Sequence, residues 1–129
     1  MTIRFNTTMR DAMVTKLTGA ISGYTLSIYT GSQPAAANDA ATGTKLVDIT
    51  INGFTSPANG SATLDTSTPN TGTAVAAGTA GWGRIVGGAG ERIDGTVGTS
   101  GTDFTINSTS ITNGATVTLT AMTVTQPAS

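Results

Sequence analysis

The chain has 129 residues, of which seven are acidic, six are basic, and none is histidine or cysteine. Charged residues make up 10% of the chain, against about 25% in a typical soluble domain. This composition excludes a Ser-His-Asp or Cys-His catalytic relay, and it excludes the common zinc and iron–sulfur sites. We therefore expect no catalytic residues, no metal and no cofactor in a chain of single-domain size.

The charge distribution argues against two classes of partner. The net charge is −1, and the six basic residues are scattered, whereas nucleic-acid binding needs clustered Lys and Arg. The apolar runs are only a few residues long, so none can span a membrane. Residues 1–17 contain charges and no continuous apolar region, so a secretory signal is not expected either. We expect neither a nucleic-acid nor a membrane partner.

Residues 8–18 have the pattern of a short amphipathic helix. Thr8 and Asp11 fit the spacing of a capping box, and Gly19 is a plausible stop. The apolar residues recur at helical spacing and form one stripe: Met9, Ala12, Met13, Leu17 and Ala20. The stripe predicts a helix that closes one side of a β core, or an arm that docks on a neighbouring subunit.

Two strands and a long loop are predicted next. Tyr24, Leu26 and Ile28 alternate with polar residues, which is the period of a half-buried strand. Residues 31–44 are turn-forming or small, so they form a surface loop, and loops of this length usually serve contact or function. A second strand follows at residues 45–51, with one apolar face made by Val47, Ile49 and Ile51.

The middle of the chain combines a strong turn signal with a weak strand signal. Asn59-Gly60 favours a type I′ turn, because both of its central residues need positive φ. Residues 61–78 are small and polar, with Leu64 and Val75 as the only apolar anchors, and predict an irregular crossing or a weak strand.

Residues 81–86 predict a central strand, with Trp82 as the largest single contributor to the core. Residues 92–97 follow as a short strand or turn, although Asp94-Gly95 by itself is more typical of a turn. The C-terminal third alternates Thr with apolar residues, and its parity slips near Ala121 or Met122, which predicts a bulge there and a tail from residue 127.

Together these patterns predict an all-β fold with one short N-terminal helix. About seven or eight strands at regular spacing favour a β-sandwich or a jelly-roll-like barrel. Residues 1–22 would form the N-terminal arm and helix, and residues 23–129 a single β-sandwich or jelly-roll-like domain.

Three features of the sequence are candidates for sites of chemistry. The glycine-rich residues 81–90 match no phosphate-binding motif, so strand and turn glycines are the better interpretation. Glu91, Asp94 and Asp103 are the acids of the second half that could pair, and a hydrolase that uses carboxylates alone would rely on Asp94 and Asp103. A sugar-stacking platform would use Tyr29 above all, with Trp82 as a second candidate.

Three phrases carry a resemblance to a known family. The first is IYTGSQP at residues 28–34, followed by Gly43-Thr44; the second is GTAGW at residues 78–82, followed by Arg84-Ile85. The third is DGTVG at residues 94–98, leading into INSTSI and a Thr/Val-rich last strand. In this order, and over residue 10 to the end, the chain resembles the small β-rich structural proteins encoded in the head gene clusters of tailed bacteriophages and prophages. It is shorter between Phe54 and Ala80 than the longer versions of that pattern.

The resemblance implies a non-enzymatic virion protein. Its most direct implication is a capsid cement or decoration protein on the capsid exterior, made in the host cytoplasm, that binds the major capsid protein and forms a homotrimer. A tail, collar or fibre-base protein with host-surface binding is the alternative. The family offers no catalytic residues to carry over, and multivalent attachment to a lattice requires none.

Overall fold

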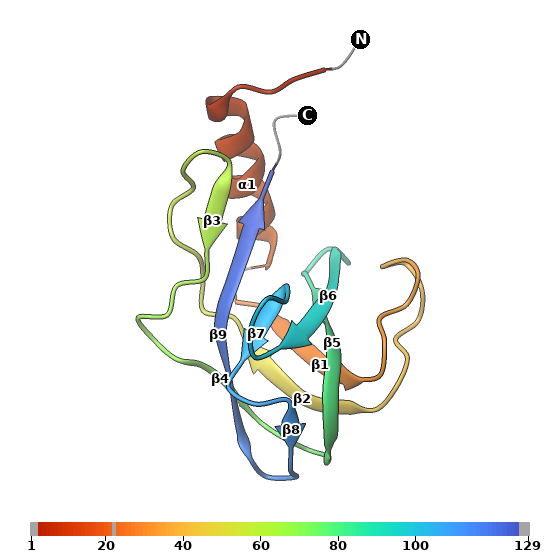
Figure 1. Cartoon of the computed structure of the whole chain (residues 1–129). Helices are drawn as coiled ribbons and strands as arrows, with labels where there is room; N and C mark the ends of the chain where they lie inside the picture. Colours follow the sequence, from red (N-terminus) through yellow and green to blue (C-terminus); the bar gives the residue numbers. More distant parts are fainter. Residues whose placement is uncertain (1–2, 22, 127–129) are drawn as a thin grey trace.

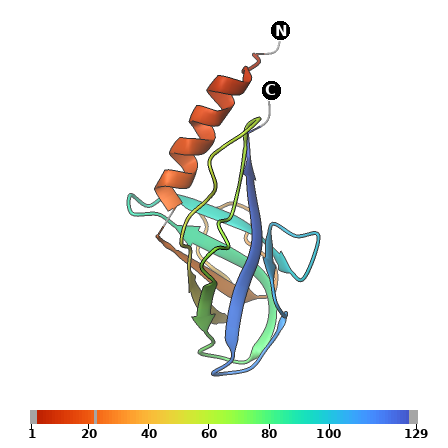
Figure 2. The same cartoon turned by 90° about the vertical axis from the view of Figure 1, so that its left-hand side faces the viewer.

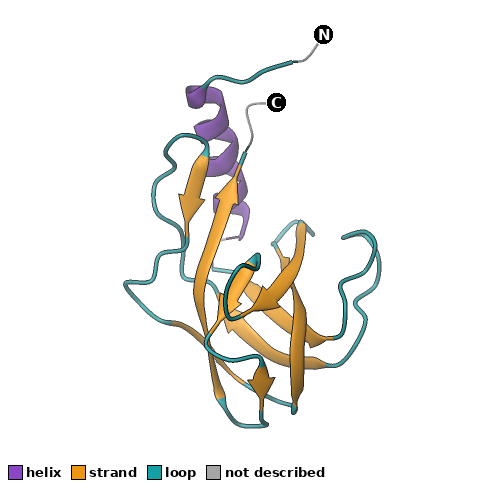
Figure 3. Cartoon of the chain, in the orientation of Figure 1, coloured by secondary structure: helices purple, strands orange, loops and turns teal. Residues whose placement is uncertain are grey.

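One α-helix and nine strands make up the computed structural model, which describes residues 3–21 and 23–126 (Figures 1 and 3). The expected fold class is confirmed, since the chain is mostly β with one short helix at its N-terminal end. The predicted tail lies outside the described residues. The elements are α1 (Thr7–Ile21), β1 (Thr25–Thr30), β2 (Lys45–Thr50), β3 (Ser61–Thr63), β4 (Asn70–Thr73), β5 (Gly78–Val86), β6 (Arg92–Gly98), β7 (Phe104–Ile106), β8 (Ser110–Ile111) and β9 (Thr116–Thr125).

The strands form one curled, mixed sheet rather than isolated hairpins. Their order is β2-β1-β5-β6-β7-β9-β3, with β4 also paired to β9 and β8 paired to β5. Only the β6–β7 pair is parallel among the described strands. The curl of the sheet gives a half-barrel (Figure 2). β4, which pairs with β9, also lies near β2, and just after β4 the Val75 N donates to Leu46 O of β2 at 2.8 Å.

The core fills the concave side of this sheet. The pairing registers align Ile49, Leu26, Ile85 and Ile93 across four neighbouring strands. The first three are fully buried, which confirms the alternation predicted for β1 and β2. Tyr24, predicted to continue this face, precedes β1 and is 41% exposed, so it adds little to the core.

The bulge predicted near the end of the chain is confirmed. Thr105 pairs with Ala121, whereas Ile106 pairs with Leu119, so β9 contains one extra residue at Thr120. An extra residue reverses the facing of the side chains beyond it. This reversal allows Leu119 and Met122 to be buried although three positions separate them.

The turn predicted at Asn59-Gly60 is also confirmed. The two residues have φ values of 54° and 77°, and Ala58 and Ser61 exchange backbone hydrogen bonds of 2.9 and 3.0 Å. Beyond this turn, the stretch predicted as an irregular crossing or a weak strand, residues 61–78, contains the two short strands β3 and β4 and the first residue of β5.

The two apolar anchors predicted for this stretch behave differently. Leu64 is buried, but the expectation for Val75 is wrong, since it is 65% exposed after the end of β4. The fully buried residue of the segment is polar. The amide of Asn70 accepts from Asn52 N at 2.8 Å and donates to Asp65 O at 3.1 Å, so it binds backbone groups that are not in a strand ladder.

The start and end predicted for the helix are wrong. Asn6, not Thr8, caps it, because Asn6 Oδ1 accepts from Met9 N at 3.0 Å. The Asp11 carboxylate does not bond to the start of the helix; it accepts from Gly60 N, in the turn before β3, at 2.6 Å. Gly19 lies within α1, which continues to Ile21.

The face that α1 buries also differs from the prediction. Val14, Thr18 and Ile21 are buried, whereas Met9 and Leu17 of the predicted stripe are 50% and 37% exposed. Thr18 can face inward because its hydroxyl donates to Val14 O at 3.0 Å within the helix. The longer apolar stripe therefore lies beside the contact with the β half-barrel and is largely accessible to solvent.

Candidate interaction surfaces

The convex side of β2, β1, β5 and β6 carries polar and aromatic residues in cross-strand rows. One row pairs Asp48 with Ser27, Ser27 with Arg84, and Arg84 with Asp94. The next row pairs Tyr29 with Trp82. We call Tyr29, Trp82, Arg84 and Asp94 the outer-face cluster.

Trp82 is fully buried and is the largest of the fully buried side chains, as expected. It lies outside the apolar cluster that fills the half-barrel. Its ring stacks on Tyr29 with centroids 4.7 Å apart and an interplanar angle of 15°. Arg84 Cζ lies 5.3 Å from the Trp82 ring centroid, within the range of a cation–π contact. The indole is thus covered by polar and aromatic neighbours.

Arg84 and Asp94 form a buried, two-pronged ion pair. Arg84 Nε donates to Asp94 Oδ1 at 2.7 Å and Nη2 donates to Oδ2 at 2.9 Å. Both side chains are only 5% exposed. Hydrogen bonding to Asp94 raises the pKa of the Arg84 guanidinium, which favours the charged form of Arg84.

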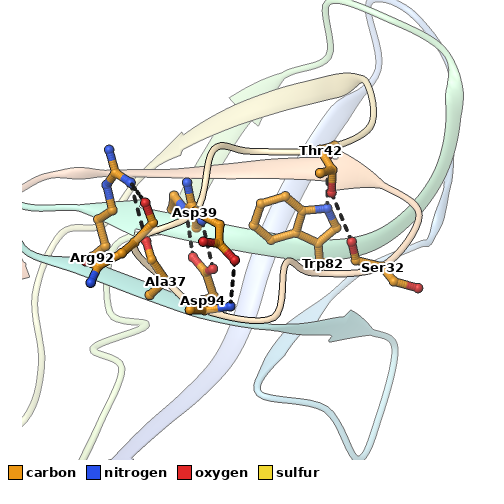
Figure 4. A network of polar contacts seen from close by, with 10 residues as sticks. Ser32, Ala37, Asp39, Thr42, Trp82, Arg92 and Asp94 are labelled. Carbon is orange, nitrogen blue, oxygen red and sulfur yellow. Dashed lines mark hydrogen bonds and ion pairs between the residues drawn. The ribbon is translucent and has the colours of Figure 1, made fainter.

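The burial of this cluster depends on residues 31–44, which we call the covering loop (Figure 4). Trp82 Nε1 donates to Thr42 O at 3.2 Å, and Arg92 Nη1 donates to Asn38 O at 3.3 Å. At the base of the loop Thr44 N donates to Thr30 Oγ1 at 2.9 Å. The loop is therefore fastened to the sheet at several points, while most of its residues have exposed outer surfaces.

The predicted acidic residues are engaged by neighbouring groups. Asp103 Oδ2 accepts from Thr96 N at 3.0 Å and from Thr96 Oγ1 at 3.2 Å, and Glu91 Oε1 accepts from Ala89 N at 2.8 Å. Asp94 and Asp103 both line one shallow hollow, but Arg84 holds the Asp94 carboxylate. The absence of catalytic residues in this chain stays a prediction.

The glycine-rich stretch behaves as predicted, but Asp94-Gly95 does not form a turn. Residues 81 and 83 lie within β5, and Gly87 N donates to Glu91 O at 2.7 Å in the turn to β6. Asp94 and Gly95 lie inside β6, opposite Arg84 and Gly83.

A second surface lies between α1 and the half-barrel. A groove of about 520 Å³ is lined on its apolar side by Met13, Leu17, Ala20, Ile21 and Ile93, and at its rims by Lys16, Glu91 and Arg92. A neighbouring hollow shares Leu17 and Ile93 with it and continues along Phe104, Met122 and Val124. We call the two together the α1 groove.

Sequence reasoning did not anticipate the main features of these surfaces. Arg84 and Asp94 are ten residues apart in the sequence, and only the register between β5 and β6 pairs them. The length of residues 31–44 predicts a loop that serves contact or function, but it does not show which face of the sheet the loop covers. For the α1 groove, the sequence does contain a signal: the spacing of Met9, Met13 and Leu17 predicts an apolar stripe on the helix.

No protein-family model, curated protein or solved structure matches the chain. Within residues 3–21 and 23–126, no group of three or more acids is placed to hold a metal ion. No helix in the same ranges has the length and apolar character needed to cross a membrane.

Proposed function

We propose that this chain is a non-enzymatic structural protein of a tailed-bacteriophage particle, which binds the major capsid protein from outside and strengthens the shell. The proposal begins from the resemblance of three sequence phrases to head-cluster proteins of phages. In this reading the protein acts as a capsid cement or decoration protein, and it associates with further copies of itself as a homotrimer.

One observation carries the proposal beyond the resemblance. The separate phrases meet at one place in the fold: Tyr29 in β1, Thr44 at the base of the covering loop, Trp82 and Arg84 in β5, and Asp94 in β6. Their shared role is to hold the covering loop against the sheet. The residues that define the resemblance thus build a fixed, exposed loop.

A loop of this kind suits attachment to a repeating lattice. Because its backbone is already fastened at Thr42 and Thr44, it loses little conformational entropy when it binds. Its small side chains permit close approach of another protein surface. Many weak contacts of this kind add up when one particle offers many equivalent sites.

The direct test combines copy number with particle stability. We expect quantitative mass spectrometry of purified particles to find the protein in numbers comparable with the major capsid protein. Particles that lack it should release DNA at a lower temperature, and added purified protein should restore the original temperature. Equal heat resistance with and without the protein would contradict the cement role.

The same count separates the alternative of a tail, collar or fibre-base protein. A component of a small symmetric ring is present in far fewer copies than the shell subunit. Host-surface binding in that case would involve Tyr29, which is only partly buried, since Trp82 is fully covered. A glycan screen of the Tyr29→Ala variant against the unmodified protein tests that route, with circular dichroism as the control for folding.

A further inference from the structure

β7 separates β6 from β9 over only part of their length (Figure 1). It pairs with the last two residues of β6, and along β9 it pairs no further than Met122. Both longer strands continue beyond β7 at this end, and no described strand lies between them there. Where it adjoins β7 this opening is one strand wide, because β7 itself fills it in the next row. We call the opening between Arg92–Asp94 of β6 and Thr123–Thr125 of β9 the β6–β9 gap.

Backbone groups of β6 face the gap without a strand to bind. The ladder between β5 and β6 begins where Gly87 N donates to Glu91 O. Alternate residues of an antiparallel ladder bond to the same neighbour. Arg92 and Asp94 therefore direct their N–H and C=O groups away from β5, toward the gap. A strand edge of this kind is a template for an added strand.

β9 presents the opposite edge of the gap in the same way. In the ladder between β3 and β9, Leu64 N donates to Met122 O at 2.8 Å. The next residue that bonds to β3 is Val124, so Thr123 and Thr125 direct their backbone groups toward the gap. A strand placed in the gap can thus form a ladder on each side.

A side chain already takes the place of a strand at one end of the gap. Thr96 follows Asp94 in the series of residues that face away from β5, and its N–H donates to Asp103 Oδ2 at 3.0 Å. The Asp103 carboxylate thus stands where a carbonyl of a longer β7 would accept. It also leaves a negative charge at the gap, since Asp103 forms no ion pair with any residue that the structure describes.

The inner side of the gap is apolar. A hollow of about 260 Å³, which belongs to the α1 groove, lies in the gap. Its apolar lining comes from α1, β6, β7 and β9: Leu17, Ile93, Phe104, Met122 and Val124. Successive side chains of a strand point to opposite faces, so alternate residues of an added strand would face this hollow. The residue between them would face the convex side, where Asp103 accepts from the Thr96 hydroxyl.

We infer that the β6–β9 gap is a binding site for an extended segment of a partner protein, which adds a strand to the sheet beyond the end of β7. The segment carries apolar side chains at alternate positions and a Lys or Arg between them. Its backbone bonds to Asp94 and Thr123, its apolar side chains fill the hollow, and its cation lies near Asp103. This inference stands apart from the proposed capsid role, because it concerns the purified chain and a peptide.

Titration of the full chain with a capped TVKVT peptide, followed by NMR of the backbone amides, tests the inference. We expect saturable shifts at Arg92, Asp94, Thr123 and Thr125, with a midpoint below about 1 mM. A TVKVT peptide with methylated backbone nitrogens keeps the side chains but loses its donors. It should bind about tenfold more weakly or worse, because its ladder bonds are lost.

The charge at the gap is tested by comparing TVKVT with TVEVT. The Lys peptide should bind about threefold more tightly, and Asp103→Asn should remove this preference while its amide oxygen still accepts from Thr96 N. Asp39→Asn is the matched control, because Asp39 is also exposed and accepts a backbone N–H, from Ala36, but lies in the covering loop. It should leave the preference unchanged.

A variant of β9 tests the ladder from the side of the protein. Thr123→Pro removes an N–H that faces the gap and leaves the bonds to β3, which come from Met122 and Val124. It should weaken binding of TVKVT by about fivefold or more. Circular dichroism and the emission of Trp82 report whether the variant is folded.

Three outcomes would overturn the inference. One is the absence of saturable shifts at the four amides. Another is equally tight binding of the methylated peptide, which would make the gap an apolar pocket instead of a site for a strand. The third is a shift of the same amides with protein concentration and without peptide, which would place a second copy of the chain in the gap. None of these results bears on the capsid role, which is tested on particles and by copy number.

Discussion

Arg84 and Asp94 lie directly opposite each other on neighbouring strands and are joined by two hydrogen bonds of 2.7 and 2.9 Å. Both side chains are almost completely shielded from water, although they lie on the convex side of the sheet. The pair forms the floor under the covering loop. The stability of this ion pair therefore affects how stably the covering loop is held against the sheet.

Asp94→Asn should destabilise the protein strongly, because it leaves the Arg84 charge buried without a counter-charge. Breaking a buried pair from one side typically costs about 3–5 kcal/mol. Urea denaturation measures the change in the free energy of unfolding. The double variant Arg84→Met/Asp94→Leu removes both charges and should lose less than the single variant; an equal or larger loss would contradict this account.

Gly43→Ala should loosen the covering loop. Gly43 has a φ of +83°, and a Cβ there would collide with the carbonyl oxygen of Thr30. Trp82 is the only tryptophan in the chain, so acrylamide quenching of its emission reports directly on the cover above it. We expect stronger quenching in this variant.

Gly31→Ala provides the matched control for that experiment. Gly31 has nearly the same φ, +84°, but a Cβ there would meet nothing within 4 Å. It should therefore cost only the backbone strain of a left-handed residue, about 1–2 kcal/mol, and leave Trp82 shielded. Equal quenching in the two variants would show that the collision is unimportant.

Asn6→Ala should lower stability by about 1 kcal/mol, because the N-cap hydrogen bond to Met9 N is lost. Thr8→Ala at the exposed position predicted from the sequence should change it by less than about 0.5 kcal/mol. Thermal denaturation followed at the helical circular dichroism band compares the two. A larger effect from Thr8 would favour the capping box after all.

Asn70→Ala should cost about 1–3 kcal/mol, because Asn52 N and Asp65 O lose their partner at a buried site. Asn107 offers a matched control. Its Oδ1 accepts from Thr118 N at 3.1 Å, but the residue is exposed, so water can replace the amide. Chemical denaturation should find Asn107→Ala much less destabilising than Asn70→Ala.

Local patterns in the sequence predicted the β elements well. The alternation around Leu26 and Ile28 gave the correct buried face, and Asn59-Gly60 gave the correct turn. Both signals depend on short-range rules, namely the two-residue period of a strand and the positive φ of a type I′ turn. Such rules act whatever the rest of the chain does.

The faces of the elements were harder to predict where distant segments decide them. Trp82 is buried as predicted, but its pattern does not reveal that a loop 40 residues earlier in the chain covers it on the convex side of the sheet. On α1, the spacing of Met9, Met13 and Leu17 is a genuine stripe, but Val14 and Ile21 supply the face that packs. Periodicity identifies an apolar face without saying what covers it.

The pairing pattern of β9 has a consequence for how the molecule folds. This strand is the last described element, and it pairs with β3, β4 and β7. Its most distant pairing joins Ser61 to Thr125. Sheets dominated by such long-range pairings fold slowly, because a large loop must close before the contacts that reward it can form. During synthesis, β2, β1, β5 and β6 can pair before β9 is made, whereas β3 and β4 must wait for it. The half-barrel is therefore completed only once residues 116–125 have left the ribosome.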